Sequence, residues 1–211
     1  MRLLVTGGAG FIGSNYVRWV LDHSDDEVTI YDALTYAGNR STLAEVLEGP
    51  HQRRVRFVHA DICDPAALAG NVAGHDAIVH FAAETHVDRS ITGPQDFAVT
   101  NCVGTNLVLH AARMAEIERV VHISTDEVYG SVEEGDSHES DLLIPRSPYS
   151  ASKAGSDLMA LSYFTTYGLP VLVTRSSNNF GPWQYPEKVI PLFLTNLLVF
   201  FFFNIYGDGL K

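Results

Sequence analysis

The chain has 211 residues, 46% of them hydrophobic and 18% charged, which excludes a disordered chain and a small disulfide-stapled fold and allows a large buried core. Its 14 basic and 25 acidic residues give a formal net charge of −11. This charge argues against a nucleic-acid partner, because affinity for a phosphate backbone comes largely from Lys and Arg, and it requires local groups to hold any anionic ligand.

The chain has two cysteines, Cys63 and Cys102, which are 39 residues apart and do not form a CxxC pair. This spacing predicts neither a disulfide framework nor a zinc site, and it is typical of a protein in a reducing cytoplasm. The first ten residues give way to glycines too early for the apolar section of a secretory signal. We therefore expect a cytoplasmic protein.

Short runs rich in Val, Ile and aromatic residues alternate with longer helical patterns along the chain. Helices are expected at about 11–23, 65–72, 95–116 and 148–167, the last with Pro148 near its start and Gly168 at its end. Strands that alternate with helices form parallel βαβ units, so the sequence predicts an α/β fold with a doubly wound parallel sheet. The expected strands are residues 2–6, 27–31, 55–59, 76–81, 119–124 and 171–175.

Glycines follow the first expected strand with the spacing GxxGxxG, at Gly7, Gly10 and Gly13. Without side chains, such a loop lets a pyrophosphate approach the backbone N–H groups and dipole of the following helix, although glycines also serve plain tight turns. Asp32, at the end of the second strand, can accept hydrogen bonds from both ribose hydroxyls and would repel a 2′-phosphate, or it can simply cap the next turn. Together these residues indicate NAD rather than NADP.

The pair Asp61-Ile62 follows the third strand. It offers a polar group for the amine of an adenine and an apolar face for the ring, which would extend the NAD site. Asp61 could equally begin the turn before Asp64 and Pro65.

Tyr149 and Lys153 are four residues apart near the start of the last expected helix, so their side chains share one face. An ammonium beside a phenol favours the phenolate, so we expect the pKa of Tyr149 to fall from about 10 toward neutral and the phenol to accept a proton. Thr125, after the fifth strand, adds a hydroxyl that can orient the same substrate oxygen. A tyrosine and lysine at this spacing are also common as a solvated surface pair.

Six longer motifs resemble the extended short-chain dehydrogenase/reductases, a Rossmann-type family. They are TGGAGFIGSN at 6–15, YDALTYAGN at 31–39, HFAAETHVDRSI at 80–91, STDEVYG at 124–130, PYSASKAGSD at 148–157 and NNFGPWQYPEKVIP at 178–191. Within that family the chain is most similar to the homodimeric lyases that dehydrate dTDP-glucose with NAD.

The resemblance implies a role for each reacting group. Tyr149 takes the O4 proton of the sugar while hydride leaves C4, Glu127 removes the C5 proton, and Asp126 protonates the departing C6 hydroxyl, which gives a 4-keto-6-deoxy sugar. Both acids reach one sugar only if the strand ends before Asp126, because successive strand residues face opposite sides. The alternatives are a related nucleotide-sugar dehydratase or decarboxylase, or an inactive NAD-binding fragment.

Further contacts follow from the resemblance, position by position. Although His80, Glu84 and His86 could be counted as metal ligands, we expect no metal. A cation is needed for the sugar-nucleotide diphosphate, and Lys188 supplies it. The implied cofactor contacts are Phe11, Ile12, Thr35, Ala83, Thr100 and Asn179, and the implied substrate contacts are Thr85, Thr125, Asn178, Lys188 and Tyr206.

The segment 189–203 is strongly apolar and could be counted as a membrane span. Pro191, Thr195 and Asn196 interrupt it, so we expect a buried segment and no membrane. Its four phenylalanines at 200–203 replace the polar connection usual in the family and would expose an apolar patch unless covered.

The family continues beyond the position where this chain ends, at Lys211. We therefore expect a chain truncated at the C-terminus, with an NAD-binding domain at 1–175 and only the start of a small substrate-binding domain at 176–211.

Overall fold

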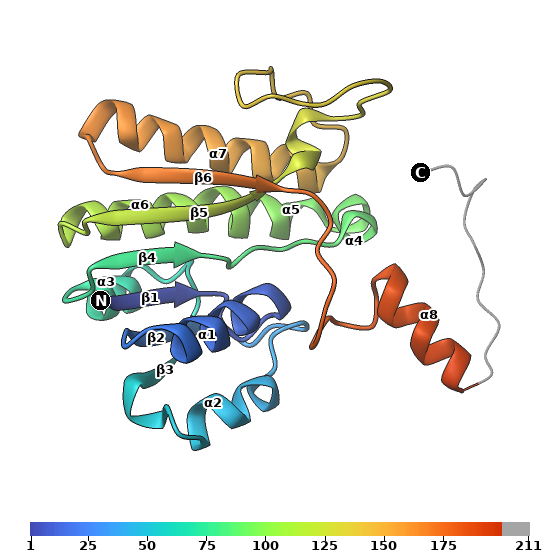
Figure 1. The fold of residues 1–211 in the computed structure, drawn as a ribbon. Helices are drawn as coiled ribbons and strands as arrows, with labels where there is room; N and C mark the ends of the chain where they lie inside the picture. The colour runs from blue at the N-terminus through green and yellow to red at the C-terminus, as the bar shows by residue number, and fades with distance from the viewer. Residues whose placement is uncertain (200–211) are drawn as a thin grey trace.

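The structure is a computed structural model and describes residues 1–199. Its centre is a six-stranded sheet in which every adjacent pair is parallel, in the order β3-β2-β1-β4-β5-β6 (Figure 1). The doubly wound prediction is confirmed, and the strand ends shift by one residue at most. The strands are β1 Arg2–Thr6, β2 Glu27–Asp32, β3 Val55–His59, β4 Ala77–His80, β5 Arg119–Thr125 and β6 Val171–Ser176.

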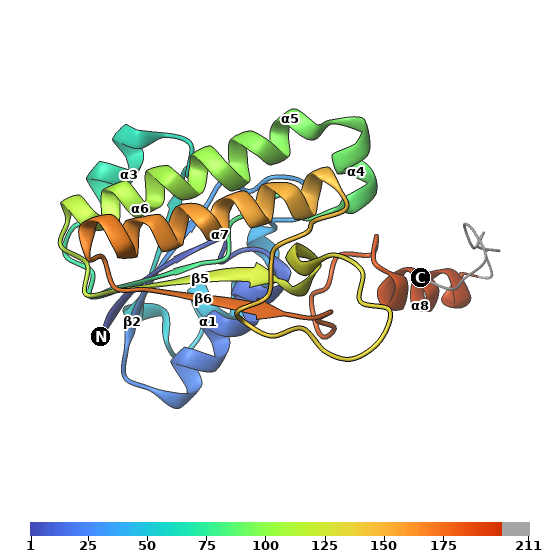
Figure 2. The same ribbon diagram turned by 90° about the horizontal axis from the view of Figure 1, so that it is seen from above.

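Helices cover both faces of the sheet. Figure 2 shows α3, α6 and α7 along one face and α1 on the other. The four expected helices are present, whereas the ten-residue α8 and several short elements were not predicted as helices. The α-helices are α1 Phe11–His23, α2 Ala44–Glu48, α3 Pro65–Val72, α4 Val87–Thr92, α5 Pro94–Phe97, α6 Thr105–Met114, α7 Pro148–Tyr167 and α8 Val189–Leu198; 3-10 turns are η1 Arg40–Leu43, η2 Gln52–Arg54 and η4 Asp126–Tyr129.

The expected helix at 95–116 is a composite. Its middle, η3 Ala98–Gly104, is a π-helix that joins α5 to α6. A π-helical turn holds more residues than an α-helical turn and is common at functional sites. This stretch lies beside the ligand-binding edge described below.

Alternation along β1 divides the core into two layers. Leu3 and Val5 are buried on the side of α1, whereas Leu4 is buried on the side of α6. Because each face of the central strand packs against a different helix layer, the strand is buried on both sides, as parallel sheets require.

The ends of α7 follow from its sequence. The side chain of Ser147 forms a reciprocal capping box with Ser150, and Pro148 occupies the first turn. At the other end Gly168 adopts a left-handed conformation with φ 68°. The helix therefore begins and ends where the sequence predicts, which fixes the position of Tyr149 in its first turn.

The prediction that segment 189–203 is buried is wrong for its described part. None of the residues of α8 is buried, and Leu198 is 79% exposed. Figure 1 shows α8 beyond the carboxyl edge of the sheet rather than against either face. Residues 200–203 lie outside the described part of the chain. Within the described residues, no helix is both long enough and apolar enough to cross a bilayer.

Candidate active site

A cavity of about 660 Å³ lies at the carboxyl edge of the sheet, within the size range of ligand sites. It sits where the strand order reverses between β1 and β4, the usual ligand position in such sheets. The cavity brings together nearly all the predicted site residues: Gly7, Gly10, Phe11, Ile12, Gly13, Asp32, Thr35, Asp61, Ile62, Ala83, Thr85, Thr100, Thr125, Glu127, Tyr149, Lys153, Asn178, Asn179 and Lys188.

Two predicted residues are not in that lining. Asp126 lines a neighbouring cavity described below. Tyr206 lies outside the described residues.

The glycine loop is needed both by the fold and by a ligand. Gly7 has φ +68°, and a Cβ there would lie 2.5 Å from the backbone nitrogen of Ala82. A Cβ on Gly13 would lie 2.3 Å from the carbonyl oxygen of Gly7. Gly10 is the N-cap of α1 and makes no side-chain cap hydrogen bond, so the helix start faces the cavity without a side chain in front of it. That bare helix start fits the pyrophosphate of NAD.

Asp32 is buried and both carboxylate oxygens accept backbone hydrogen bonds, from Ala9 at 2.9 Å and from Leu34 at 2.8 Å. Burial raises the pKa of Asp32, and the two N–H groups oppose this. The capping interpretation is therefore confirmed, while the side chain also lines the cavity where a ribose would lie. A carboxylate that lines the cavity beside the glycine loop fits the adenosine half of NAD.

Asp61 also has a local structural role. Its carboxylate accepts a hydrogen bond from the backbone of Cys63 at 2.8 Å, and its carbonyl accepts one from the Tyr31 hydroxyl at 2.9 Å. Ile62 is buried but contributes to the cavity wall. The turn interpretation of Asp61 is confirmed, and adenine contact by this pair stays a prediction.

Tyr149 and Lys153 are both buried at the start of α7, which excludes the solvated surface pair. The Tyr149 ring packs edge-on against Phe97 with centroids 6.3 Å apart. The Lys153 ammonium, 4% exposed, donates to the carbonyl of Ile123 at 2.7 Å. Both side chains line the cavity.

The prediction of a lowered tyrosine pKa is wrong for this ligand-free structure. Burial, with a smaller contribution from the carboxylate of Glu127, raises the pKa of Tyr149 to about 12, although a hydrogen bond with Thr125 acts to lower it. Burial lowers the pKa of Lys153 to about 8. The physical reason is that loss of water outweighs the neighbouring ammonium, whose hydrogen bond goes to Ile123.

Strand β5 ends at Thr125 and η4 begins at Asp126, as the predicted convergence of the two acids requires. The Thr125 hydroxyl donates to Asp126 at 3.2 Å and accepts from the Glu127 backbone at 3.3 Å. Burial raises the pKa of the Glu127 carboxyl, Asp126 raises it further, and Lys188 opposes this. A raised pKa makes Glu127 a stronger base.

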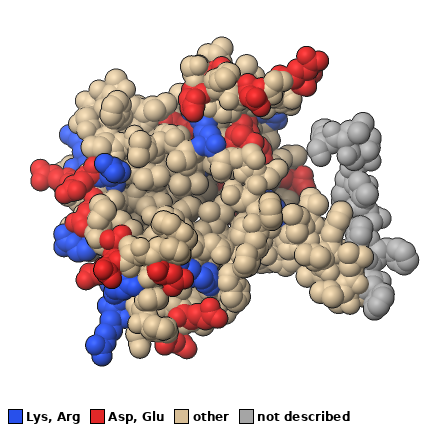
Figure 3. Space-filling view, in the orientation of Figure 1, with Lys and Arg blue, Asp and Glu red and all other residues tan. Residues whose placement is uncertain are grey.

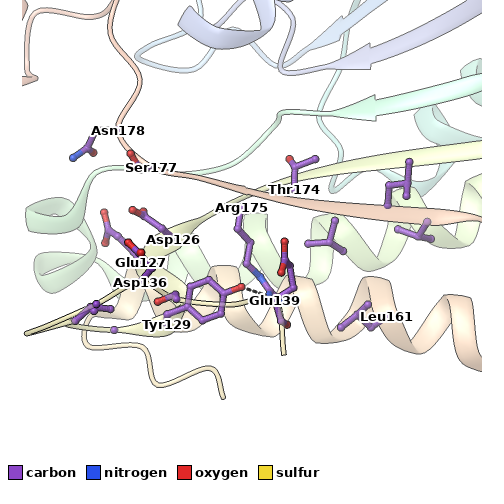
Figure 4. Close-up of a pocket in the computed structure, with 17 residues that line it drawn as sticks. Asp126, Glu127, Tyr129, Asp136, Glu139, Leu161, Thr174, Arg175, Ser177 and Asn178 are labelled. Atoms are coloured by element: carbon purple, nitrogen blue, oxygen red, sulfur yellow. Dashed lines mark hydrogen bonds between the residues drawn. The ribbon is translucent and has the colours of Figure 1, made fainter. Parts of the chain in front are cut away.

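The two acids line different walls. Asp126 is exposed and lines a second cavity of about 870 Å³, shown in Figure 4, which also includes Asn178. Glu127 lines both cavities. The acids therefore lie at the boundary between the two cavities, with Glu127 facing Tyr149.

Charge around the site is uneven. In Figure 3 acidic side chains lie over the loop after β5, and acidic and basic side chains are mixed over the left and lower parts of the view. Two lysines, Lys153 and Lys188, line the first cavity. They supply the local positive charge that the net charge of −11 makes necessary for an anionic ligand. Within the described residues, no group of three or more His, Cys, Asp or Glu could hold a metal ion.

Sequence analysis missed Asn101, a fully buried amide in η3. Its carbonyl accepts from the Glu84 backbone at 2.9 Å, and its amide donates to the Glu84 carbonyl at 2.9 Å and to the Ser152 hydroxyl at 2.8 Å. It thereby holds the cavity wall after β4 against the helix of Tyr149. A polar residue within an otherwise apolar helical pattern was the available signal.

A second missed group ties three distant segments together beside the cavity. The Tyr36 hydroxyl donates to Glu187 at 3.1 Å, and the Arg89 guanidinium stacks 3.6 Å from the Tyr36 ring. Glu187 and Tyr185 line the cavity, and Tyr185 packs edge-on against Tyr36. No spacing within a single motif reveals such a group, because its members meet only in the folded chain.

Comparison with known proteins gives a family and several relatives. A family model described as GDP-mannose 4,6 dehydratase matches residues 4–200. The low-salt glycan biosynthesis protein Agl12 of Haloferax volcanii is 54% identical over 209 residues, which cover 99% of this chain and 66% of that protein. A dTDP-glucose 4,6-dehydratase of Streptomyces niveus is 53% identical over 214 residues, 99% of this chain and 63% of that protein.

Among solved structures, DesIV, a dTDP-glucose 4,6-dehydratase of Streptomyces venezuelae described with NAD bound, matches with a TM-score of 0.95 and 58% identity. The match covers 99% of this chain and 66% of that one. The chain thus spans 63–66% of the length of these three relatives.

Proposed function

We propose, because this chain belongs to the GDP-mannose 4,6 dehydratase family, that the protein is an NAD-dependent hydro-lyase that converts dTDP-glucose to dTDP-4-keto-6-deoxyglucose. One observation carries the proposal: the glycine loop, Thr125, Glu127, Tyr149 and Lys153 line a single cavity. Relatives named dTDP-glucose 4,6-dehydratase, at 53% and 58% identity, support this substrate.

The chain offers a distinct group to each part of NAD. The start of α1, with Gly10 before it, would hold the pyrophosphate, and Asp32 would hold the adenosine ribose. When bound, NAD accepts hydride from C4 of the sugar and returns it to C6, so there is no net consumption of cofactor. The remaining steps are proton transfers, which the side chains of this chain perform.

Tyr149 is the proposed base for O4. Its phenol is protonated in the ligand-free protein, since burial places its pKa at about 12. The Thr125 hydroxyl stabilises the phenolate when its proton turns from Asp126 to Tyr149. Lys153 lies one helical turn away with a pKa near 8. Tyr149 therefore takes the O4 proton only while these groups and a bound ligand favour its anion.

The two acids perform the elimination. With a ketone at C4, Glu127 takes the C5 proton, the C5–H electrons form the C5=C6 bond, and the C6–O bond breaks as Asp126 protonates the leaving hydroxyl. Water departs, and Glu127 later returns a proton to C5 as C6 receives hydride. The boundary position of the acids allows a sugar seated beside Tyr149 to reach both.

The test is to incubate the NAD-loaded protein with dTDP-glucose deuterated at C4 and to analyse the sugar by NMR. We expect a 4-keto product that carries the deuterium at C6. Deuterium released to solvent, or a sugar inverted at C4 without a ketone, would contradict the proposal. Parallel incubations with UDP-glucose and GDP-mannose measure which nucleotide is accepted.

We also infer a homodimer that forms through the outer faces of η3 and α7. Val99 and Val103 on η3 and Leu158, Leu161 and Phe164 on α7 are all between 43% and 59% exposed. Figure 2 shows these helices side by side on one outer face, so their apolar groups form a surface that a second copy could cover. Sedimentation equilibrium tests this: Phe164→Glu should shift a dimer toward monomer, whereas Leu142→Glu, in an exposed loop, should not.

We propose two further properties. The NAD-binding domain at 1–175 gives way to a substrate-binding segment from 176, which is supported by the end of β6 at Ser176 and the departure of the chain from the sheet. Tyr206, proposed as a substrate contact, belongs to that segment. A cytoplasmic location is supported by Cys63 and Cys102, both free thiols.

A further inference from the structure

Next to Asp126 and Glu127, polar contacts of Arg175 link Asp157 on α7 to Tyr129 on η4. The Arg175 guanidinium on β6 donates through Nε to Asp157 at 2.8 Å and through Nη1 to the Tyr129 hydroxyl at 2.7 Å. Figure 4 shows Arg175 and Tyr129 meeting along the wall of the second cavity, next to Asp126 and Glu127. None of these three residues has a role in the steps described above.

These contacts connect the helix that carries Tyr149 to the turn that carries Asp126 and Glu127. Asp157 follows Lys153 by four residues and Tyr149 by eight, so all three share one face of α7. Tyr129 is the last residue of η4, the turn that begins with the two acids. Arg175 therefore joins the helix that carries the phenol to the turn that carries the carboxyl groups.

The Asp157 end of these contacts is buried. Asp157 is 0% exposed, and His122 Nε2 lies 3.3 Å from its second oxygen. Burial raises the pKa of Asp157, but the neighbouring His122 and Arg175 outweigh this, so the pKa is lowered and the carboxylate stays charged. The Arg175 side chain is 13% exposed. A buried charged pair with a planar donor holds its geometry more firmly than a surface pair.

Arg175 also contacts η4 in a second way. Its guanidinium lies 4.9 Å from the centroid of the Tyr129 ring and reaches the carbonyl of Glu139 at 3.5 Å. On β6 it is paired in register with Ser124 of β5, the residue before Thr125. The arginine is thus held by the sheet and by α7, and it contacts the short turn from there.

We propose that Arg175 and Tyr129 are positioning residues that hold the Asp126–Glu127 turn at the distance from Tyr149 that water elimination requires. This inference rests on the proposed dehydratase function. Proton transfer depends on sub-ångström placement, and a misplacement of about 1 Å can cost about 10²-fold in rate. Tyr149 is anchored in α7 itself, so loss of the link should impair elimination and spare the oxidation of C4.

Tyr129→Phe in the NAD-loaded protein is the first test, because it removes one hydroxyl and keeps the ring beside the guanidinium. We expect kcat for dTDP-glucose to fall about tenfold, with KM little changed and with NADH absorbance building up during a single turnover, since oxidation outruns elimination. Tyr163→Phe is the matched control: it removes a hydroxyl from α7 that contacts Asn106 instead. Equal slowing of oxidation and elimination, or behaviour like the control, would overturn the proposal.

Arg175→Lys tests whether the two contacts form one link. A lysine keeps a positive charge beside Asp157 but cannot reach both partners with a planar fork. We expect the same accumulation of NADH, and the double variant with Tyr129→Phe should be no slower than Arg175→Lys alone. Independent, multiplicative losses would show that no single link exists.

A second readout does not depend on turnover. Amide hydrogen exchange of residues 126–130, where the Gly130 amide donates to the Glu127 carbonyl at 3.2 Å, should be about tenfold faster in Tyr129→Phe than in the unmodified protein or Tyr163→Phe. Unchanged exchange would overturn the positioning role. If the unmodified protein makes no 4-keto product, the dehydratase function fails, while the exchange result still decides whether Arg175 holds the turn.

Discussion

Different groups line the two ends of the first cavity. At the nucleotide end the tightest part of the wall is backbone, because a side chain at Gly7 or Gly13 would meet other main-chain atoms. At the sugar end the wall includes three ionisable side chains, the buried Tyr149 and Lys153 and the half-buried Glu127. We therefore expect substitutions that add volume to have their main effect at the nucleotide end. Changes of charge and pH should have their main effect at the sugar end.

The largest expected effect is at the phenol. Tyr149→Phe removes the base for O4 and should lower kcat by about 10⁴-fold, the upper range for acid–base catalysis. NAD binding, followed by calorimetry, should persist because the nucleotide end is untouched. A variant that still forms NADH from dTDP-glucose at the original rate would assign the proton transfer to another group.

Next in size is the loss of the carboxylate base. Glu127→Gln keeps the shape of the side chain but cannot take the C5 proton, so elimination should slow by about 10³-fold while C4 oxidation survives. NADH should accumulate, as measured by absorbance after rapid mixing. Glu133→Gln, in the exposed loop after β5, is the control and should turn over normally.

The charged end should also make stability depend on pH. Burial lowers the pKa of His122 from 6.5 to about 4. Between these two pH values His122 is protonated in the unfolded chain but stays neutral in the folded chain. The contribution of neutral His122 to the free energy of unfolding is therefore fully present above pH 6.5. It is lost as the pH falls to about 4, and the loss amounts to up to about 3 kcal/mol.

Urea unfolding at pH 7 and at pH 4.5 measures this loss. His122→Gln should reduce the difference between the two pH values without abolishing it, because burial also lowers the pKa of His80. His23→Gln, on the exposed end of α1, should keep the slope of the unmodified protein. An unchanged slope in His122→Gln would move the acid sensitivity to another residue.

The smallest expected effect comes from a methyl group added at the nucleotide end of the first cavity. Gly13→Ala places a methyl group against the Gly7 carbonyl and should lower the unfolding free energy by about 2 kcal/mol and weaken NAD binding, equally at pH 6 and pH 8. Gly70→Ala in α3 meets no atom within 4 Å and should instead stabilise by about 0.5–1 kcal/mol. Thermal unfolding with and without NAD tests both.

The same contrast explains what the sequence could predict. Strand runs, the Pro148 and Gly168 boundaries of α7 and the glycine spacing are local signals, and each is confirmed. The pKa of Tyr149 was predicted from one neighbour, yet it depends on burial and on Glu127, which is far away along the chain. The exposure of α8 likewise depends on what covers it, and hydropathy does not contain that information.

The contacts of Asn101 show the same limit more sharply. Its partners Glu84 and Ser152 lie 17 and 51 residues away. The composition of η3 gives no sign of a π-helix, because the stretch continues the apolar pattern of the helices on either side. Only the folded chain shows why an amide stands in an otherwise apolar row.

The π-helical stretch has a consequence for how this chain can vary in length. An extra residue per turn changes the phase of α6 relative to α5, which lets Asn101 face Glu84 while Val108 and Ala112 still face the core. Removing a single residue between 98 and 104 would restore an ordinary α-helix. Asn101 could then no longer face Glu84 while Val108 and Ala112 face the core. In this chain both sets of contacts therefore depend on the number of residues between 98 and 104.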